Sequence, residues 1–442
     1  MPENNSPTIV KDYITIDGER VGFDLTLITK SKSISIPLDN FVSFILEEEI
    51  SSPFQKGVIK LKNDSNRFDT LSIPNANADF TLAETGENLL LLNLNFQSTT
   101  KTYIFFIIEE STEVQNGTKI KNFFVEDSTL YKLRNNKTVF STSSLVQGDS
   151  TQLSDKDRQV NVSDAIKEII TDSLTKNLVS EDSWYNSISK INHTSNFNES
   201  RLDSLDFLLD KSMDQNNNTL LLLKRDNQFG LYSIQEMYNN YLNLNYFNNF
   251  GGNFTISGEE YIPAKTNTVV GFRVNEYNMY NENSIDTVEN IINHKVINYD
   301  FNNKKFNIFS KDNSVEALTK NIRENFLNKR TDIVREESPS IKNNTIFKSI
   351  YSTTSDLETV RYEGRNNLLK NLMTFSTMIS MKTNGIYSIN VGNFVNLNYE
   401  TNYENKMTKK LNGGWFVTAL KHTLTQNSFG TEIVCTKFHQ AI

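Results

Sequence analysis

Cysteine and long apolar runs are scarce in this sequence. Cys435 is the single cysteine among 442 residues, so no intrachain disulfide can form, and assembly in a cytoplasm is the simple expectation. The most apolar run, LLLLNLNF from Leu89, is much shorter than the roughly 20 residues of a membrane-spanning helix. The N-terminus, MPENNSPTIVKDY, has neither the basic nor the apolar region of a signal peptide. We therefore expect no direct insertion into a membrane.

Clusters of lysine and arginine are also lacking. The formal net charge is −8 and the isoelectric point is about 5.3. Proteins that bind nucleic acid usually carry a basic face, so sequence-specific binding of DNA or RNA is disfavoured. The acidity fits a soluble protein, and it would also let DNA pass without adhering.

Motifs of catalysis and metal binding are absent. The four histidines (His193, His294, His422 and His439) form no HExxH motif, and there is no GxSxG, Walker A or GxGxxG sequence. A Cys435–His439 ligand pair is rejected, because a strand places these residues ~13 Å apart. His422 lies in a predicted strand and is expected to be structural. The carboxylates of Glu47 to Glu49 would alternate between the two faces of a strand and cannot converge on one substrate. The sequence predicts no catalytic, cofactor-binding or metal-binding residue.

Residues 10 to 140 have the alternation of β-strands. YIFFIIEES (103–111) and KIKNFFVED (119–127) flank Asn116-Gly117, a strong signal for a hairpin turn. Three glutamates and a Ser-Ser-Pro-Phe sequence end one strand near Pro53, where we expect the chain to turn a corner because proline donates no backbone hydrogen bond. This part of the chain is predicted to be an antiparallel sheet or barrel.

The middle of the chain mixes helix and strand. Residues 141–160 are polar and are predicted to be a linker. A helix follows with one apolar face from Val162 to Leu174 and Ser163 as its N-cap, and a second helix has Leu205, Leu208 and Leu209 as its apolar stripe. Residues 219–234 predict a hairpin that turns at 225–228.

The last half of the chain alternates between loop-rich and regular segments. We expect loops at 237–265, a strand at 268–277, and helices at 284–294, 315–327 and 356–373. From Met373 the alternation of apolar residues predicts strands, with a turn at Asn384-Gly385 and a closing meander. The predicted fold class is α+β, mainly β.

Four segments resemble, in the correct order, baseplate central hub proteins (tail hubs) of contractile-tailed bacteriophages, which are related to the hub portion of type VI secretion spike proteins. The first segment runs from Leu46 to Leu71 and the second from Arg201 to Met237. The third and weaker one runs from His294 to Ile308, and the fourth is the C-terminal meander. The matching residues of the first segment are Glu48, Ile50, Ser52, Pro53, Gly57 and Asp64. Those of the second are Leu205, Phe207, Leu208, Leu209, Ser212, Phe229, Gly230 and Ser233. Those of the fourth are Gly392, Val395, Leu397, Gly414, Trp415, Val417, His422, Thr431 and Lys437.

The resemblance implies two tail-tube-like antiparallel β-barrel domains with mixed α/β insertions. The first barrel domain would span residues 1–138, followed by a linker and α insertion at 139–200. The second would combine a helix and hairpin at 201–236 with C-terminal strands at 373–442, interrupted by an α/β insertion at 237–372.

The resemblance also implies a structural role in the virion. Such hubs are homotrimers that adapt the hexameric tail tube to a trimeric central spike, and DNA only passes through their axial channel. The implied partners are the tail tube protein, the central spike or tail lysozyme protein, and baseplate wedge proteins. The implied location is the tail baseplate, assembled in the host cytoplasm, and Glu47 to Glu49 would lie near the rim or lumen of the barrel. No enzymatic activity is implied.

Two other functions stay open. One is the hub of a contractile injection system of the type VI kind, although such chains commonly continue into a β-helical needle and this sequence ends at Ile442. The other is a cell-wall hydrolase, for which the sequence offers no convergent catalytic groups.

Overall fold

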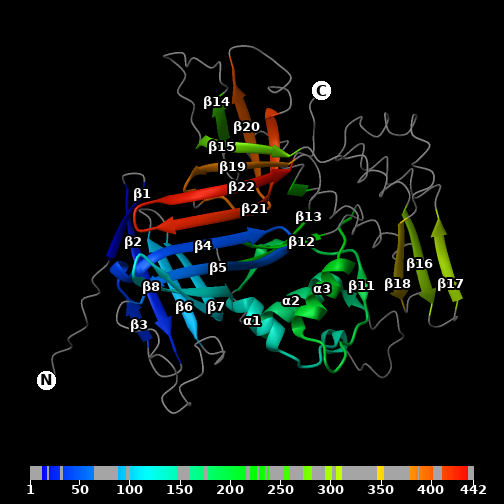
Figure 1. The fold of residues 1–442 in the computed structure, drawn as a ribbon. Helices are drawn as coiled ribbons and strands as arrows, with labels where there is room; N and C mark the ends of the chain where they lie inside the picture. Colours follow the sequence, from blue (N-terminus) through cyan, green and yellow to red (C-terminus); the bar gives the residue numbers. More distant parts are fainter. Residues whose placement is uncertain are drawn as a thin grey trace. The chain divides into compact units, whose positions relative to one another are not determined.

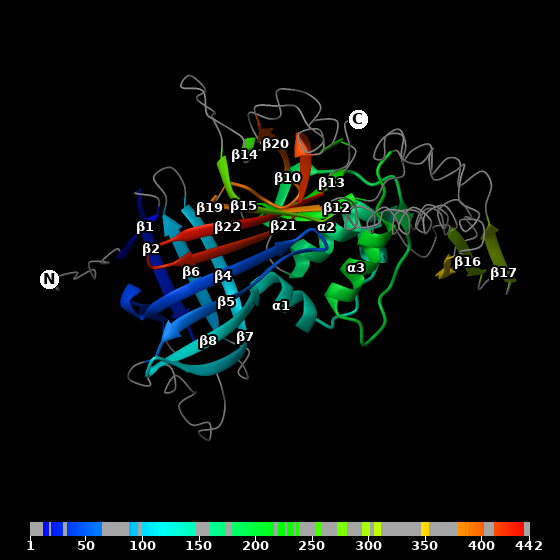
Figure 2. The ribbon, with the colours of Figure 1, turned by 45° about the horizontal axis from the view of Figure 1, so that its top comes forward.

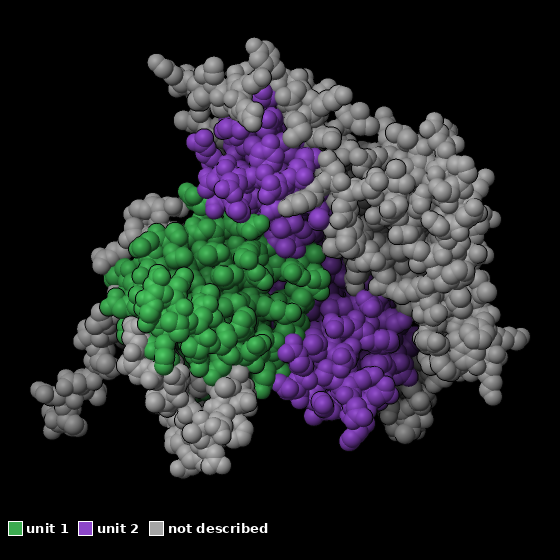
Figure 3. Space-filling view, viewed as in Figure 1, with its two compact units in different colours: residues 1–132, 384–387, 420–432 green, residues 133–383, 388–419, 433–442 purple. Residues whose placement is uncertain are grey.

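Two compact units make up the computed structural model of the chain (Figure 3). Unit 1 comprises residues 1–132, 384–387 and 420–432, and unit 2 comprises residues 133–383, 388–419 and 433–442. The chain therefore leaves unit 1 at residue 132 and returns to it twice. The structure describes residues 12–16, 19–29, 33–63, 88–95, 100–146, 159–173, 178–215, 220–225, 228–233, 236–237, 253–257, 272–280, 294–300, 305–310, 346–352, 378–386, 388–401 and 411–436.

Strands β1 to β8 of unit 1 form an antiparallel sheet (Figure 1). Their spatial order is β1–β2–β6–β7–β8–β5–β4, with β3 beside β2. The strands are β1 Asp12–Ile16, β2 Glu19–Ile28, β3 Ser33–Ile36, β4 Phe41–Glu49, β5 Ser52–Lys62, β6 Leu89–Asn95, β7 Thr100–Gln115 and β8 Thr118–Asp127. A 3-10 helix, η1 (Leu38–Asn40), precedes β4, and the helix α1 (Ser128–Asn135) follows β8. The predicted sheet of the N-terminal region is confirmed.

Buried side chains from the strands of unit 1 pack together into one apolar core. Alternate residues of β6, namely Leu90, Leu92 and Leu94, are buried, as its period-2 pattern predicts. The rings of Phe23 and Phe41 pack with their centroids 4.7 Å apart. Each such side chain contributes about 1.5–3 kcal/mol when it is fully buried. The core therefore depends on residues from every part of the sheet.

The corner between β4 and β5 lies earlier than the sequence suggested. The turn is at Ile50 and Ser51, and Pro53 is the second residue of β5. The prediction of a corner at Pro53 is wrong for a physical reason: β8 pairs with β5 only from Lys56 onward, so a proline before that point removes no hydrogen bond to β8.

Residues 420–432, which we call the clasp, complete unit 1 from the far end of the sequence. The clasp includes the second half of β21 (Gly413–Thr425) and the start of β22 (Phe429–Thr436). In the sheet, β21 lies next to β4. Leu424 and Phe429 of the clasp join the core of unit 1.

Two helices belong to unit 2. Helix α2 (Val162–Ser173) buries Val162, Ala165, Ile166, Ile169 and Ile170, which confirms the predicted face as far as the structure describes it. Ser163 is not the N-cap, because it lies within the first turn and its buried hydroxyl has no hydrogen-bond partner. Helix α3 (Arg201–Lys211) begins with a capping box of Ser200 and Asp203 and buries Leu205 and Leu208.

The hairpin of unit 2 was correctly predicted from sequence. It consists of β12 (Leu220–Arg225) and β13 (Gln228–Ser233), which pair antiparallel, and β10 (Val179–Trp184) pairs parallel with β13. Within the described part of the chain these strands form a sheet of their own. Two short strands, β9 (Val160–Asn161) and β11 (Lys190–Ile191), pair with each other.

The predicted linker at 141–160 is structured at its beginning. Residues Thr142–Leu145 form a 3-10 helix, η3, and Thr142 is fully buried. The amide of Thr142 donates to the carbonyl of His193 (2.9 Å), and its hydroxyl accepts from the amide of His193 (2.9 Å). A polar segment can be buried here because its polar groups form hydrogen bonds with His193. Residues 147–158 lie outside the described residues.

The C-terminal strands of unit 2 include parallel pairs. Strand β14 (Asn253–Ser257) lies in the segment predicted to be loop-rich, and it pairs parallel with β15 (Phe272–Tyr280) and with β20 (Phe394–Glu400). Strand β15 also pairs antiparallel with β19 (Met378–Asn384). The meander of β20, β21 and β22 is confirmed by their successive pairings. The indole of Trp415 is fully buried, and its Nε1 donates to the carbonyl of Leu411 (2.8 Å).

A further small sheet comprises β16 (His294–Asp300), β17 (Lys305–Ser310) and β18 (Ile346–Ser352). Strand β16 pairs antiparallel with β17 and parallel with β18. His294 begins β16. The helix predicted at 284–294 is contradicted at its last residue, because His294 is in β16; its other residues and the helices predicted at 315–327 and 356–373 lie outside the described residues. The expectation of a mainly β chain with some helix is confirmed.

Candidate assembly surface

Strands β7 and β8 of unit 1 continue together past the end of β6 (Figure 2). Strand β6 pairs with β7 only as far as Phe106. We call residues 108–119 the arm; it comprises the end of β7, the turn at Asn116 and Gly117, and the start of β8. Both turn residues have positive φ values, 51° and 80°, as a tight hairpin turn requires. The predicted hairpin is confirmed, but the length of the arm was not foreseen.

The arm exposes apolar side chains and one edge. Ile108 is 43% exposed and Val114 is 69% exposed. Ile108 lies at a shift of register, so it has no opposite residue in β8. Among the described residues, no strand pairs with residues 108–115 on the side away from β8. Exposed apolar residues on an unpaired edge are typical of a surface that contacts another chain.

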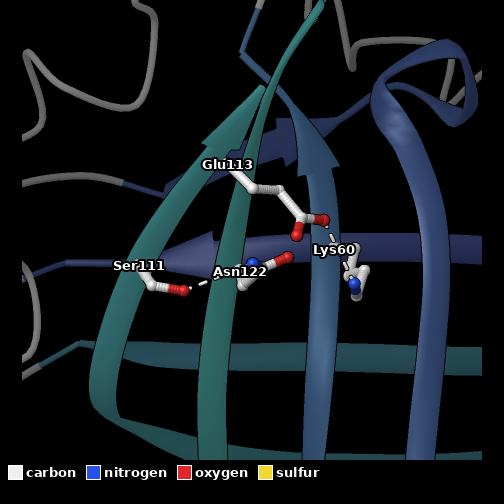
Figure 4. A network of polar contacts seen from close by, with 4 residues as sticks. All are labelled: Lys60, Ser111, Glu113 and Asn122. Carbon is white, nitrogen blue, oxygen red and sulfur yellow. Dashed lines mark hydrogen bonds and ion pairs between the residues drawn. The ribbon is translucent and has the colours of Figure 1, made fainter. Parts of the chain in front are cut away.

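Two polar contacts link the arm to residues of β5 and β8 (Figure 4). Lys60 Nζ donates to Glu113 Oε1 (3.1 Å), and Asn122 Nδ2 donates to Ser111 Oγ (3.2 Å). These residues come from three neighbouring strands and share one face of the sheet, because directly opposite residues in paired strands share a face. The contacts hold the arm in register with the sheet.

A second ion pair lies on the other face of the arm. Lys121 Nζ is 3.2 Å from Glu110 Oε1, and the two side chains are only 10% and 8% exposed. Glu110 is directly opposite Phe123, a core residue, so this pair lies at the end of the apolar interior of unit 1. The arm therefore has an ion pair on each face, of which the buried pair of Lys121 and Glu110 is less screened by solvent than the exposed pair of Lys60 and Glu113.

The acidic triplet Glu47 to Glu49 has partners within its own chain. Glu47 forms an ion pair with Lys421 of the clasp (3.1 Å). Glu48 Oε1 accepts from the side-chain amide of Gln55 (2.7 Å), and Glu49 Oε2 accepts from the hydroxyl of Ser51 (3.2 Å). The ion pair of Glu47 with Lys421 offsets part of the negative charge of the triplet.

The two histidines whose side chains the structure describes are partly or wholly buried. His193 stacks on Phe207 with ring centroids 4.6 Å apart, and burial lowers its pKa. His422 is buried, as expected for a structural residue, and its Nδ1 lies 3.0 Å from the hydroxyl of Thr431. Burial, with a smaller effect of Lys101, lowers the pKa of His422 to about 3. Both imidazoles are therefore neutral near pH 7.

Other chemical groups do not converge in the described parts of the chain. Burial raises the pKa of the Cys435 thiol, which keeps it protonated. No cluster of three or more His, Cys, Asp or Glu side chains that could hold a metal ion occurs among the described residues. None of the helices described is both long enough and apolar enough to span a bilayer.

The residues that carry the sequence resemblance mostly belong to the scaffold. Leu205, Phe229, Val395, Trp415 and Val417 are buried core residues. Phe207 differs, because it is 39% exposed. The residues that carry the resemblance are therefore characteristic of the fold, and none of them lies in the arm. The sequence of β7 carries little signal for the arm, because the apolar run from Tyr103 to Ile108 is followed by EESTEVQ, in which Val114 is the one apolar residue.

Comparison with known proteins identifies the fold. No family model and no curated protein matches the sequence. Among solved structures, a tail protein from Neisseria meningitidis MC58 superposes with a TM-score of 0.51 at 9% identity, covering 94% of this chain and 96% of that one. The 43 kDa tail protein of prophage MuSo2 from Shewanella oneidensis gives 0.49 at 7% identity, covering 94% and 98%. The E. coli c3393 protein, described as a type VI secretion component similar to the T4 tail proteins gp27 and gp5, gives 0.44 at 8% identity, covering 94% and 77%. The chain thus shares its fold with the Neisseria tail protein, and the resemblance seen in the sequence is confirmed at the level of the fold.

Proposed function

We propose that this chain is a structural component of a phage-type tail baseplate. The observation that carries the proposal is the fold shared with the Neisseria tail protein along nearly the whole length of both chains. The order of the four sequence segments supports it independently. Such a role needs no catalytic group, only surfaces that join copies and partners.

More specifically, the chain acts as a tail hub. Three copies form a ring that joins a hexameric tail tube to a trimeric central spike, with an axial channel through which DNA passes. Two tube-like β modules per chain, residues 1–138 and residues 201–236 with 373–442, supply six pseudo-equivalent positions, which is how a trimer can match a hexamer. Of the second module, residues 384–387 and 420–432 belong to unit 1. The partners are the tube protein, the spike or tail lysozyme protein, and wedge proteins.

The arm of unit 1 is the surface that we assign to contact between chains. Val114 is exposed, and no strand of the described part of the chain pairs with the outer edge of residues 108–115, so both can contact another chain. Lys60 and Lys121 pair with Glu113 and Glu110 of the arm, which favours the observed position of that edge and lowers the loss of conformational entropy when chains associate.

Mass photometry of the purified chain, alone and with its tail tube and spike proteins, tests the proposal. A trimer has a mass of about 152 kDa, three times 50.7 kDa. Cryo-electron microscopy of the same particle is expected to show a ring with an axial channel. Dimers or tetramers, or a ring without a channel, would contradict the hub.

A pair of matched variants tests the arm. Val114→Asp places a charge on the exposed apolar position of the arm and is expected to reduce trimer formation at least tenfold. Val139→Asp is the control, because Val139 is also exposed (49%) but belongs to unit 2 and lies outside the arm. Both variants keep the melting temperature of the parent, since neither side chain is buried. Equal trimer formation by the two variants would exclude the arm as the interface.

A further inference from the structure

The clasp lies next to β4 although it comes from the other end of the sequence. Leu38 and Gln426 are 388 residues apart and in direct contact. Within unit 1, β4 has β5 on one side and β21 on the other. Without the clasp, the second side of β4 would be an unpaired edge among the described residues.

One side chain fastens the tip of the clasp. Gln426 Nε2 donates to the carbonyl of Leu38 (2.9 Å) and to the carbonyl of Phe41 (2.7 Å). Leu38 is the first residue of η1, and Phe41 is both its C-cap and the first residue of β4. The side-chain amide of Gln426 thus satisfies two backbone carbonyls at the start of β4.

The apolar part of the contact is small relative to the core that it joins. Leu424 and Phe429 enter the core of unit 1, whose other buried members all lie between Ile14 and Val125. Those members pack on one another across β1 to β8, so most of the core does not require the clasp. Removal of the clasp would take two of the twenty buried members out of this core.

The clasp is ordered by its own hydrogen bonds. Thr425 Oγ1 accepts from the amides of Asn427 (3.3 Å) and Ser428 (3.0 Å), and the amide of Thr425 donates to the carbonyl of Ser428 (2.8 Å). These bonds form a tight turn within the clasp itself. The two strands of the clasp also pair with each other. It therefore has the properties of a preformed hairpin ligand.

We propose that the edge of β4 and the carbonyls of η1 form a binding site for a β-hairpin, and that residues 420–432 occupy it as a ligand within the same chain. The clasp leaves this site as a unit while β1 to β8 stay folded. Recognition uses strand addition at β4, a side-chain amide on the η1 carbonyls, and two apolar side chains. During synthesis, this site stays empty until the C-terminal part of the chain is made.

Hydrogen exchange on the full-length protein tests whether the clasp opens separately. In Leu424→Asp/Gln426→Ala, amides of β4 and of residues 420–432 are expected to exchange at least tenfold faster than in the parent, while those of β2 and β6 keep their rates. Thr423→Ala is the matched control, because Thr423 lies in the same strand between two core-facing positions. Equal acceleration throughout unit 1 would overturn the proposal, because the clasp would then be an inseparable part of the core.

Peptide binding tests whether the vacated site has the stated specificity. A fluorescein-labelled peptide of residues 420–432 is expected to bind the full-length double variant and not the parent, in which the site is filled. The same peptide carrying Leu424→Asp and Gln426→Ala is expected not to bind. Equal binding of both peptides, or no binding to a variant whose β4 amides have become exposed, would overturn the proposal.

The parent protein provides a measurement for the case in which the double variant does not fold. In rising urea, amides of the clasp and of β4 are expected to exchange together, at lower urea than amides of β2 and β6. Simultaneous opening of all four segments would contradict a separate binding site.

Discussion

The two halves of strand β21 differ in how they are buried. In the first half, which belongs to unit 2, Trp415, Phe416, Val417 and Thr418 are all buried in succession, so both faces of the strand are covered. In the second half, which belongs to unit 1, buried residues alternate with more exposed ones from Leu420 to Thr425. One continuous strand thus serves as an interior strand in one unit and as a one-sided addition to a sheet in the other. The comparison indicates that the first half contributes most to stability and the second half is the separable one.

Trp415→Ala is the strongest test of this comparison. The indole is fully buried and its Nε1 donates to Leu411, so its removal leaves a large cavity and an unpaired carbonyl. We expect a loss of about 3–5 kcal/mol in the free energy of unfolding. Urea titration measures it, with Thr423→Ala as a control expected to change stability by less than about 0.5 kcal/mol. An unchanged urea midpoint would remove Trp415 from the core.

Acid should weaken the second half through His422. The pKa of His422 is lowered from the ordinary value of about 6.5 to about 3. Between these two pH values the imidazole is protonated in the unfolded chain and neutral in the folded chain. The contribution of neutral His422 to the free energy of unfolding is fully present above pH 6.5 and is lost as the pH falls towards 3. Between pH 7.5 and pH 5 the expected loss is about 2 kcal/mol.

The control for the acid effect is His422→Gln, which cannot be protonated in this range. Urea titrations of the parent and of this variant at both pH values isolate the contribution of His422. If the two proteins lose equal stability on acidification, other groups carry the pH dependence.

Gln426→Ala should release the tip of the clasp. It removes two hydrogen bonds to backbone carbonyls at the ends of η1, and we expect a loss of about 1–2 kcal/mol. Hydrogen exchange should place this loss in the clasp and β4 and not at β12 or β13. The neighbouring Asn427→Ala, at an exposed position, serves as the control. Loss of protection at β12 and β13 to the same extent would mean that the effect is not local to unit 1.

The smallest effect is expected for the ion pair of Lys421 and Glu47. The side chains are 45% and 53% exposed, so solvent screens the attraction. We expect Lys421→Ala to change stability by less than about 1 kcal/mol. A double-mutant cycle with Glu47→Ala measures the coupling between the two charges. A coupling of several kcal/mol would show that this contact, rather than Gln426, holds the clasp.

Local sequence patterns predicted the elements that local interactions stabilise. Asn116-Gly117 predicted its hairpin because the positive φ angles of the turn suit these two residues. The apolar spacing from Val162 to Ile170 predicted α2 because a helix places those side chains on one face. The exact start of α2 was missed: the helix begins at Val162, so the predicted cap Ser163 lies inside its first turn.

Predictions failed where distant residues decide the outcome. The polar segment from residue 141 reads as a linker, yet Thr142 is buried because His193, far along the chain, satisfies its hydrogen bonds. Pro53 reads as a corner, yet it fits within β5 because β8 does not extend to it. In both cases the deciding partner is remote in sequence, and no local pattern contains it.

The sequence by itself determined α2, the two hairpins and the closing meander, the scarcity of catalytic motifs, and a resemblance that the fold confirms. Only the tertiary structure decided that residues 420–432 lie against β4, that Glu47 is paired, and that no described strand pairs with the outer edge of the end of β7. The physical reason is that the alternation of apolar and polar residues predicts which face of a strand is buried. Which strand lies beside it depends on how the apolar faces of all the strands pack together.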